Sequence, residues 1–225
     1  MTSIYQLALG ERFNQLHPKI QERFGFSSMD ETAAVGEGVM RRIWFSKLVA
    51  LPLLIGAQRN IMFPEGGEEV PFTIENYAYQ DSYGRETVTW LRKFSFPGKL
   101  RRFDATMIYS PGRGQIVDYL GSKQHLAVDL EVTAAPNGGI RIRSGEQRFY
   151  EGLLQFRWPS WLTGTAEVCE WYDEEAACFR IQVRVTSRWL GPLFGYEGAF
   201  HNRFIPAAAG DIPPGARPLR EEPRE

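Results

Sequence analysis

Residue types that mark several common functional classes are scarce in this sequence of 225 residues. It contains only two cysteines, Cys169 and Cys178, which excludes a disulfide-rich scaffold and a cysteine-rich metal domain. It contains three histidines, His17, His125 and His201, and none lies at metal-ligand spacing from another. We therefore expect two reduced thiols and no metal site.

Motifs that bind cofactors and segments that enter membranes are also missing. The sequence has no phosphate loop, no dinucleotide fingerprint and no G-x-S-x-G nucleophile motif, so we expect no cofactor. The most apolar stretch, residues 48–57, is half as long as the ~20 residues that a membrane-spanning helix needs, which predicts no transmembrane segment. Residues 1–16 lack the basic start and apolar run of a secretory signal, so we expect a cytoplasmic protein.

Neither sign of charge dominates the chain. It has 26 basic and 27 acidic residues, which give a net charge of −1. A nucleic-acid-binding protein usually carries a clear basic excess, so we expect no nucleic-acid partner. Hydrophobic residues make up 43% of the chain and aromatic residues 13%, and this composition predicts a folded domain with a sizeable core.

The start of the chain predicts short helices. Residues 3–24 read as two of them, the first capped by Ser3 and the second with Pro18 in its first turn. Residues 25–38 are rich in serine, glycine and acidic residues, and this composition predicts a loop.

A strand and a capping helix are expected next. Residues 40–45 alternate as a first strand. Ser46 then predicts the N-cap of a helix that runs to about Gly56, and Pro52 within it should kink or shorten it.

From residue 69 onward, apolar and polar residues alternate with the period of a β-strand. The plainest stripe runs from Phe179 to Val185. About nine or ten strands with short connections favour antiparallel neighbours, and a sheet of that size curls or closes. The predicted fold is therefore an α+β domain that is predominantly antiparallel β. It is a curled sheet, barrel or cup of about nine to ten strands, with short N-terminal helices and one capping helix.

The domain boundary is expected near residue 205. Residues 1–205 are predicted to form a single β-rich domain. Residues 206–225 hold five prolines among several charges, a composition typical of a disordered tail.

Polar side chains that interrupt apolar stripes are the candidate ligand-binding residues. Arg92 shares a strand face with Trp90, and a charge on a buried face needs a partner. If these faces line one cavity, Arg92 and Glu170 could pair there, or present charge to a ligand's carboxylate or carbonyl. The plainer interpretation is a solvent-exposed face or a structural ion pair. The candidates are Arg92, Glu170, Asn76, Arg42, Trp90 and Tyr119.

Several short phrases of the sequence occur together in a known family. They are Val70–Phe72, Gly84–Thr87 before Trp90, Arg102–Ala105, Val117–Gly121, Glu170–Asp173 and Leu193–Gly198. Together they resemble an uncharacterised bacterial family, domain of unknown function 4166, over roughly residues 3 to 205. The resemblance implies a stand-alone module, or one attached to oxidoreductase-like or membrane segments, that serves a partner. It supplies no catalytic or binding residues.

The leading hypothesis is a β cup that binds a small molecule or a lipid-like ligand, apolar or carboxylated. One alternative is a cofactor-independent enzyme that performs acid/base chemistry on a carbonyl compound. It requires a pair such as Glu170 with Arg92, or Asp104 with Tyr119, inside one pocket.

A second alternative is a non-catalytic module that contacts a partner or a membrane surface through residues 46–57. Exposure of an apolar face there favours this interpretation, and burial of Leu48, Leu51 and Ile55 counts against it. The sequence leaves the oligomeric state open, because an exposed strand edge would allow two chains to pair.

Overall fold

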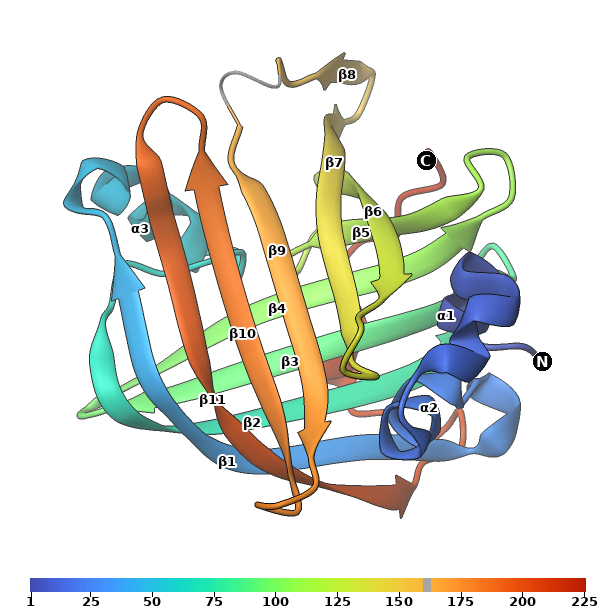
Figure 1. Cartoon of the computed structure of the whole chain (residues 1–225). Helices are drawn as coiled ribbons and strands as arrows, with labels where there is room; N and C mark the ends of the chain where they lie inside the picture. The colour runs from blue at the N-terminus through green and yellow to red at the C-terminus, as the bar shows by residue number, and fades with distance from the viewer. Residues whose placement is uncertain (160–162) are drawn as a thin grey trace.

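Ten antiparallel strands close into a barrel, and one extra strand forms a hairpin beside it (Figure 1). The computed structural model describes residues 1–159 and 163–225. The strands are β1 (Thr32–Phe45), β2 (Gly67–Gln80), β3 (Glu86–Phe96), β4 (Lys99–Ser110), β5 (Gln115–Leu120), β6 (Leu126–Ala134), β7 (Ile140–Glu151), β8 (Leu154–Arg157), β9 (Thr165–Asp173), β10 (Cys178–Ser187) and β11 (Gly191–Pro206).

The strand order explains the closure. Consecutive strands from β1 to β7 pair as a meander, and β9, β10 and β11 pair in the same way. The two series join where β1 pairs with β11 and where β7 pairs with β9. This closed antiparallel sheet with short helices confirms the predicted fold class.

The N-terminal helices close one end of the barrel. They are α1 (Ile4–Leu9), η1 (Gly10–Gln15) and α2 (Pro18–Gly25), which Figure 1 shows together at one end. Ser3 caps α1 by accepting a hydrogen bond from the Gln6 backbone, and Pro18 occupies the first turn of α2, both as expected. The Tyr5 hydroxyl donates to the Met107 sulfur at 3.5 Å, so α1 packs directly on the interior of the sheet.

The first strand is longer than the sequence predicts. After η2 (Ser28–Asp30), β1 begins at Thr32, inside the segment expected to be a loop. The sequence does not indicate this early part of β1, because its glycines interrupt the apolar alternation. They serve close packing instead: a Cβ at Gly38 would overlap the Ala199 carbonyl oxygen on β11.

The capping helix also differs in detail from the expectation. Ser46 makes no side-chain cap, and a single 3₁₀ turn, η3 (Lys47–Val49), precedes α3 (Ala50–Ala57). Pro52 therefore lies in the first turn of α3, where a missing backbone N–H breaks no helical hydrogen bond. The helix is short rather than kinked.

Aromatic side chains fill one part of the barrel interior. Phe63, Phe72, Phe94, Phe194 and Tyr196 pack with ring centroids 4.9 to 6.3 Å apart. Such edge-to-face and tilted pairs stabilise a core beyond the area that they bury. The interior is therefore solid around these rings.

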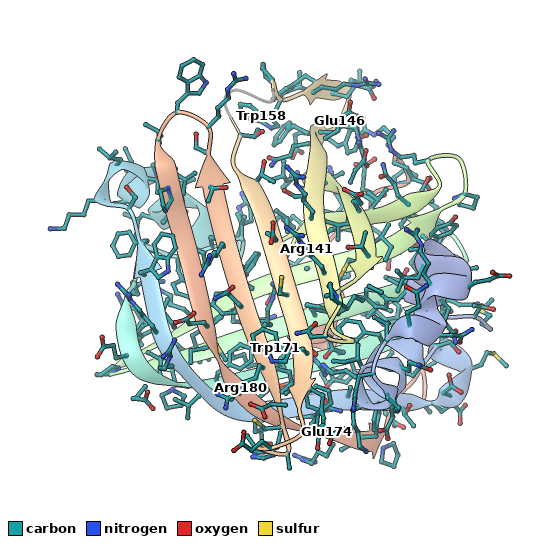
Figure 2. The ribbon with its side chains drawn as sticks, viewed as in Figure 1. Arg141, Glu146, Trp158, Trp171, Glu174 and Arg180 are labelled. Carbon is teal, nitrogen blue, oxygen red and sulfur yellow. The ribbon has the colours of Figure 1, made fainter. Side chains whose placement is uncertain are left out.

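The outer face carries charged side chains, as the alternation requires. Figure 2 shows Arg141, Trp171 and Arg180 on this face. Arg141 pairs with Glu167 at 2.8 Å, and Arg180 pairs with Asp173 at 3.0 Å. Exposed pairs of this kind contribute little to stability, so they mark the solvent side rather than a site.

Residues 206–225 lie against the outside of the barrel, although their composition predicts a disordered tail. After β11, Ile212 packs on Tyr79 and Leu91, and so does Ala216 of the short helix η4 (Pro214–Ala216). The Tyr119 hydroxyl donates to the Arg224 carbonyl at 2.8 Å. The tail covers apolar side chains on the outer face of β2 to β5. The sequence alone does not place these side chains beneath it.

Two further expectations concern the thiols and membrane segments. Cys169 and Cys178 are free. Within residues 1–159 and 163–225, no helix is both long and apolar enough to cross a membrane.

The docked tail predicts a position-dependent effect of truncating its side chains. Ile212 is 7% exposed and Leu219 is 76% exposed. Ile212→Ala should lower the free energy of unfolding by about 2 kcal/mol, because it removes buried methyl groups. Leu219→Ala should change it by less than about 0.5 kcal/mol. Urea unfolding of both variants measures this difference, and equal effects would contradict the docked position.

Candidate functional site

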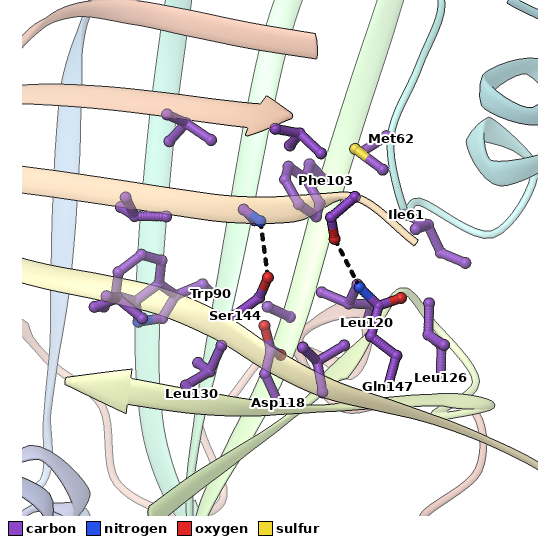
Figure 3. A pocket seen from close by; sticks show the side chains of 18 of the residues that line it. Ile61, Met62, Trp90, Phe103, Asp118, Leu120, Leu126, Leu130, Ser144 and Gln147 are labelled. Atoms are coloured by element: carbon purple, nitrogen blue, oxygen red, sulfur yellow. Dashed lines mark hydrogen bonds between the residues drawn. The ribbon is translucent and has the colours of Figure 1, made fainter. Parts of the chain in front are cut away.

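A cavity of about 180 Å³ lies inside the barrel, beside the aromatic cluster (Figure 3). Its walls are mostly apolar and come from β3 to β7 and from β9 to β11, with Ile61 and Met62 of the α3–β2 connection at one side. Its main apolar lining side chains are Trp90, Phe103, Met107, Leu120, Val128 and Leu130. The polar lining side chains are Arg92, Asp118, Ser144 and Gln147.

Two of these polar side chains join strands that diverge at the cavity. The β7–β9 ladder ends at the pair Arg143 and Glu167. Beyond it, Ser144 Oγ accepts from the Ala166 backbone at 2.7 Å, and Gln147 Nε2 donates to the Gly164 carbonyl at 3.0 Å (Figure 3). The wall of the cavity is therefore held here by two side-chain hydrogen bonds instead of a strand ladder.

Asp118 is the exceptional group in the cavity. It lies on β5 opposite Met107 and Val128, and Figure 3 shows its carboxyl among apolar side chains. Its Oδ1 atom is buried and has no hydrogen-bond partner in the part of the chain that the structure describes. Burial raises the pKa of Asp118 from 3.8 to about 7, while the charge of Arg92 opposes the shift.

Arg92 is the cation of the same cavity. Its Nε donates to the Phe103 carbonyl at 3.1 Å, and its Nη1 donates to the Tyr196 hydroxyl at 3.4 Å. The guanidinium lies 3.7 Å from the centre of the Phe103 ring, a cation–π contact. Among the described ion pairs none joins Arg92 to Asp118, so the two charges influence each other across the cavity without touching.

Trp90 lies between this cavity and the N-terminal helices α1 and α2. It lines the cavity, and its ring centroid lies 5.9 Å from that of Phe24 on α2. Of the residues that the sequence suggested, Arg92 and Trp90 thus lie together in one cavity.

Glu170 does not line the cavity and lies beside α2 instead. It forms a buried ion pair with Arg23 of α2, and Arg23 Nη1 also donates to the Asn202 side chain at 2.7 Å. Burial raises the pKa of Glu170, and the charge of Arg23 opposes the shift. Glu170 therefore pairs with Arg23 of α2 and not with Arg92.

The other three suggested residues lie apart from the cavity. Asn76 borders a void of about 10 Å³ beside Arg23 and Trp90. Arg42 is exposed on β1. Tyr119 is on β5 but faces the tail rather than the interior, as its bond to Arg224 indicates.

The pairs required for acid/base chemistry do not form. Glu170 pairs with Arg23, as described, and Asp104 instead contacts Arg102 at 2.7 Å and Asn60 at 3.0 Å on the outer side. No group of three or more metal-ligating side chains gathers among the residues described here. Among the described residues, the cavity therefore presents one carboxyl, Asp118, with an unpartnered oxygen, and one guanidinium, Arg92, that already donates hydrogen bonds.

Sequence reasoning missed Asp118 and selected its neighbour Tyr119. The only available signal was an acidic residue between Ile116 and Leu120 on one face of a short strand. Both faces of β5 are buried, one by the interior and one by the tail, so alternation alone does not distinguish them.

The raised pKa of Asp118 predicts a pH dependence of stability. Below about pH 3.8 the carboxyl is protonated in both states. Between there and about pH 7 the unfolded chain loses this proton while the folded chain keeps it. Stability therefore falls with rising pH across this window, by about 4 kcal/mol from this group.

The Asp118→Asn variant lacks this titration. Between pH 4 and pH 8, the free energy of unfolding of this variant should rise by several kcal/mol relative to that of the unsubstituted protein. Only the unsubstituted protein loses stability as the pH rises. Chemical denaturation of both proteins at several pH values measures this. A difference that is constant with pH would contradict a buried, unpartnered carboxyl.

Comparison with known proteins places the chain in a family. A curated protein of Bacillus subtilis (strain 168), "Uncharacterized protein YndH", is 37% identical over 201 residues, which cover 89% of this chain and 97% of that protein. No solved structure matches the chain. Residues 16–200 match the model of a family described as "Domain of unknown function (DUF4166)", in agreement with the resemblance seen in the sequence. The chain therefore belongs to the DUF4166 family.

Proposed function

We propose that the barrel binds a small, largely apolar molecule that carries one hydrogen-bond donor, such as a hydroxyl group. The observation that carries this proposal is the Asp118 carboxyl in an apolar cavity, whose buried Oδ1 atom has no hydrogen-bond partner among the described residues. A buried polar group without a partner costs stability, and such groups cluster at binding and active sites. A ligand donor would supply the missing hydrogen bond.

The size of the cavity limits the ligand. Its volume of about 180 Å³ is similar to that of an engineered apolar cavity, about 150 Å³, that binds benzene. This supports a single ring or a short branched chain, and argues against a long acyl chain in the cavity as it stands. Of the two ligand classes expected from the sequence, the cavity volume therefore favours a small molecule over a lipid-like ligand.

The charges in the cavity favour a neutral ligand. Arg92 is buried in the same wall and opposes a second cation, while Asp118 opposes an anion once it is ionised. A neutral hydroxyl or amide N–H can donate to Asp118 without adding a net charge. Because Arg92 Nε and Nη1 already donate to protein acceptors, an oxygen on the same ligand would accept from Arg92 Nη2.

The divergence of β7 and β9 supports a route into the cavity. Only two side-chain hydrogen bonds hold this part of the wall among the described residues, one from Gln147 to the Gly164 carbonyl and one from the Ala166 backbone to Ser144. Breaking one side-chain hydrogen bond costs far less than breaking a strand ladder.

Phenol and toluene test the proposal because they have nearly the same shape and differ by a hydroxyl and a methyl group. We expect both to bind, and we expect Asp118→Leu to lower the affinity for phenol relative to toluene by about tenfold or more. This is the loss expected for one hydrogen bond to a charged group. Titrations followed by protein NMR measure the four dissociation constants.

A cavity-filling variant provides the control. Ala166 lines the cavity, so Ala166→Leu should abolish binding of both molecules while a thermal melt shows a folded protein. The proposal fails if both molecules bind to this variant as they bind to the unsubstituted chain, or if Asp118→Leu leaves the ratio of affinities unchanged.

A further inference from the structure

Exposed apolar side chains gather at one end of the barrel, on three separate segments. Of the 17 large apolar side chains that are exposed in the described chain, ten lie on these segments. Residues 47–55 contribute four of them, residues 153–158 four, and residues 188–190 two. We call these three segments the apolar rim.

The strand register places the apolar rim at a single end. β1 ends at Phe45, which pairs with Phe194 near the start of β11, and the Ser46 backbone donates to the Leu193 carbonyl at 2.7 Å. Figure 1 shows α3, the β10–β11 turn and β8 at this end, with α1 and α2 elsewhere. Figure 2 shows Trp158 at this end of the barrel and Glu174 at the opposite end.

The apolar rim combines exposed hydrophobic groups with positive charge. Its three segments contain Lys47, Arg157 and Arg188 and no acidic residue. Arg157 pairs with Glu146 of β7 at 3.1 Å. Lys47 and Arg188 form no ion pair with any residue that the structure describes, so their charges face solvent.

The exposure of α3 is unusual for a helix of this composition. Leu53 is its only buried side chain among the eight residues, although the helix is apolar all round. A helix with no polar face is normally enclosed by protein or lipid. The exposure of Leu48, Leu51 and Ile55 thus favours contact of this segment with another apolar phase over a purely internal capping role.

We infer that the apolar rim rests on the surface of an anionic lipid bilayer. Charge complementarity favours this occupant, because the exposed cations Lys47 and Arg188 adjoin the exposed apolar groups. Two exposed tryptophans, Trp158 and Trp189, are of the type that settles at the boundary between headgroups and acyl chains. With only eight residues, α3 is suited to lie in the interface rather than to cross it.

One wall of the cavity adjoins the apolar rim. Leu193 lines the cavity and is joined through its carbonyl to Ser46, directly before residue 47 of the apolar rim. A small apolar molecule dissolved in lipid would therefore be close to the cavity wall. The lipid contact itself does not depend on the proposed ligand binding.

Sedimentation with vesicles tests the inference on the full chain. The protein should bind vesicles of phosphatidylcholine and phosphatidylglycerol more tightly than vesicles of phosphatidylcholine alone, by roughly fivefold for each cation near the surface. Raising the salt concentration to 0.5 M should remove most of this difference, because salt screens exposed charges.

Matched surface variants identify the contact. Leu51 is 68% exposed on the apolar rim, and Met29 is 66% exposed on η2, outside it. The double substitution Leu51→Ser and Trp189→Ser should weaken vesicle binding by at least about tenfold, since it removes buried apolar area. Met29→Ser should leave it unchanged, and all variants should melt at similar temperatures because these side chains are exposed.

Three outcomes would overturn the inference. The first is no sedimentation with phosphatidylglycerol vesicles. The second is equal binding by the apolar-rim and Met29 variants. The third is a dimer, seen by native mass spectrometry, that dissociates when the apolar rim is substituted, because a second copy would then be its occupant.

Discussion

Closure of the sheet is the constraint on which the rest of the structure depends. Once β6 pairs with β7, and β7 with β9, the barrel has an interior that side chains or helices must fill. The phenylalanines around Phe94 fill one region, and α1 and α2 plug an end. The space left over is the cavity beside Asp118.

Asp118 gives that remaining space its chemical character. An apolar cavity can stay empty at a modest cost, whereas an unpartnered carboxyl within it destabilises the folded chain at neutral pH. The buried ion pair of Glu170 with Arg23 shows the alternative, in which a carboxylate has a partner beside it. The contrast between these two carboxyls supports a structural role for Glu170 and a binding role for Asp118.

The sequence predicted the sheet well because its signals are local. Period-two stripes and turn residues indicated an antiparallel sheet large enough to close, and Arg92 was selected as a candidate because it interrupts such a stripe. Contacts between residues far apart in the chain could not be predicted from such local signals. Arg23, for example, lies 147 residues from its partner Glu170. Asp118 was missed for a related reason, since the tail that buries the other face of β5 lies about a hundred residues further along the chain.

The most direct test of this account is the pKa of the Asp118 carboxyl, measured by carbon NMR in the presence and absence of phenol. In the free protein it should lie at about 7. Phenol should lower it, because a donor to the carboxylate favours the ionised form. An ordinary value near 3.8, or a raised value that phenol leaves unchanged, would contradict the assignment of Asp118 as the group that holds the ligand.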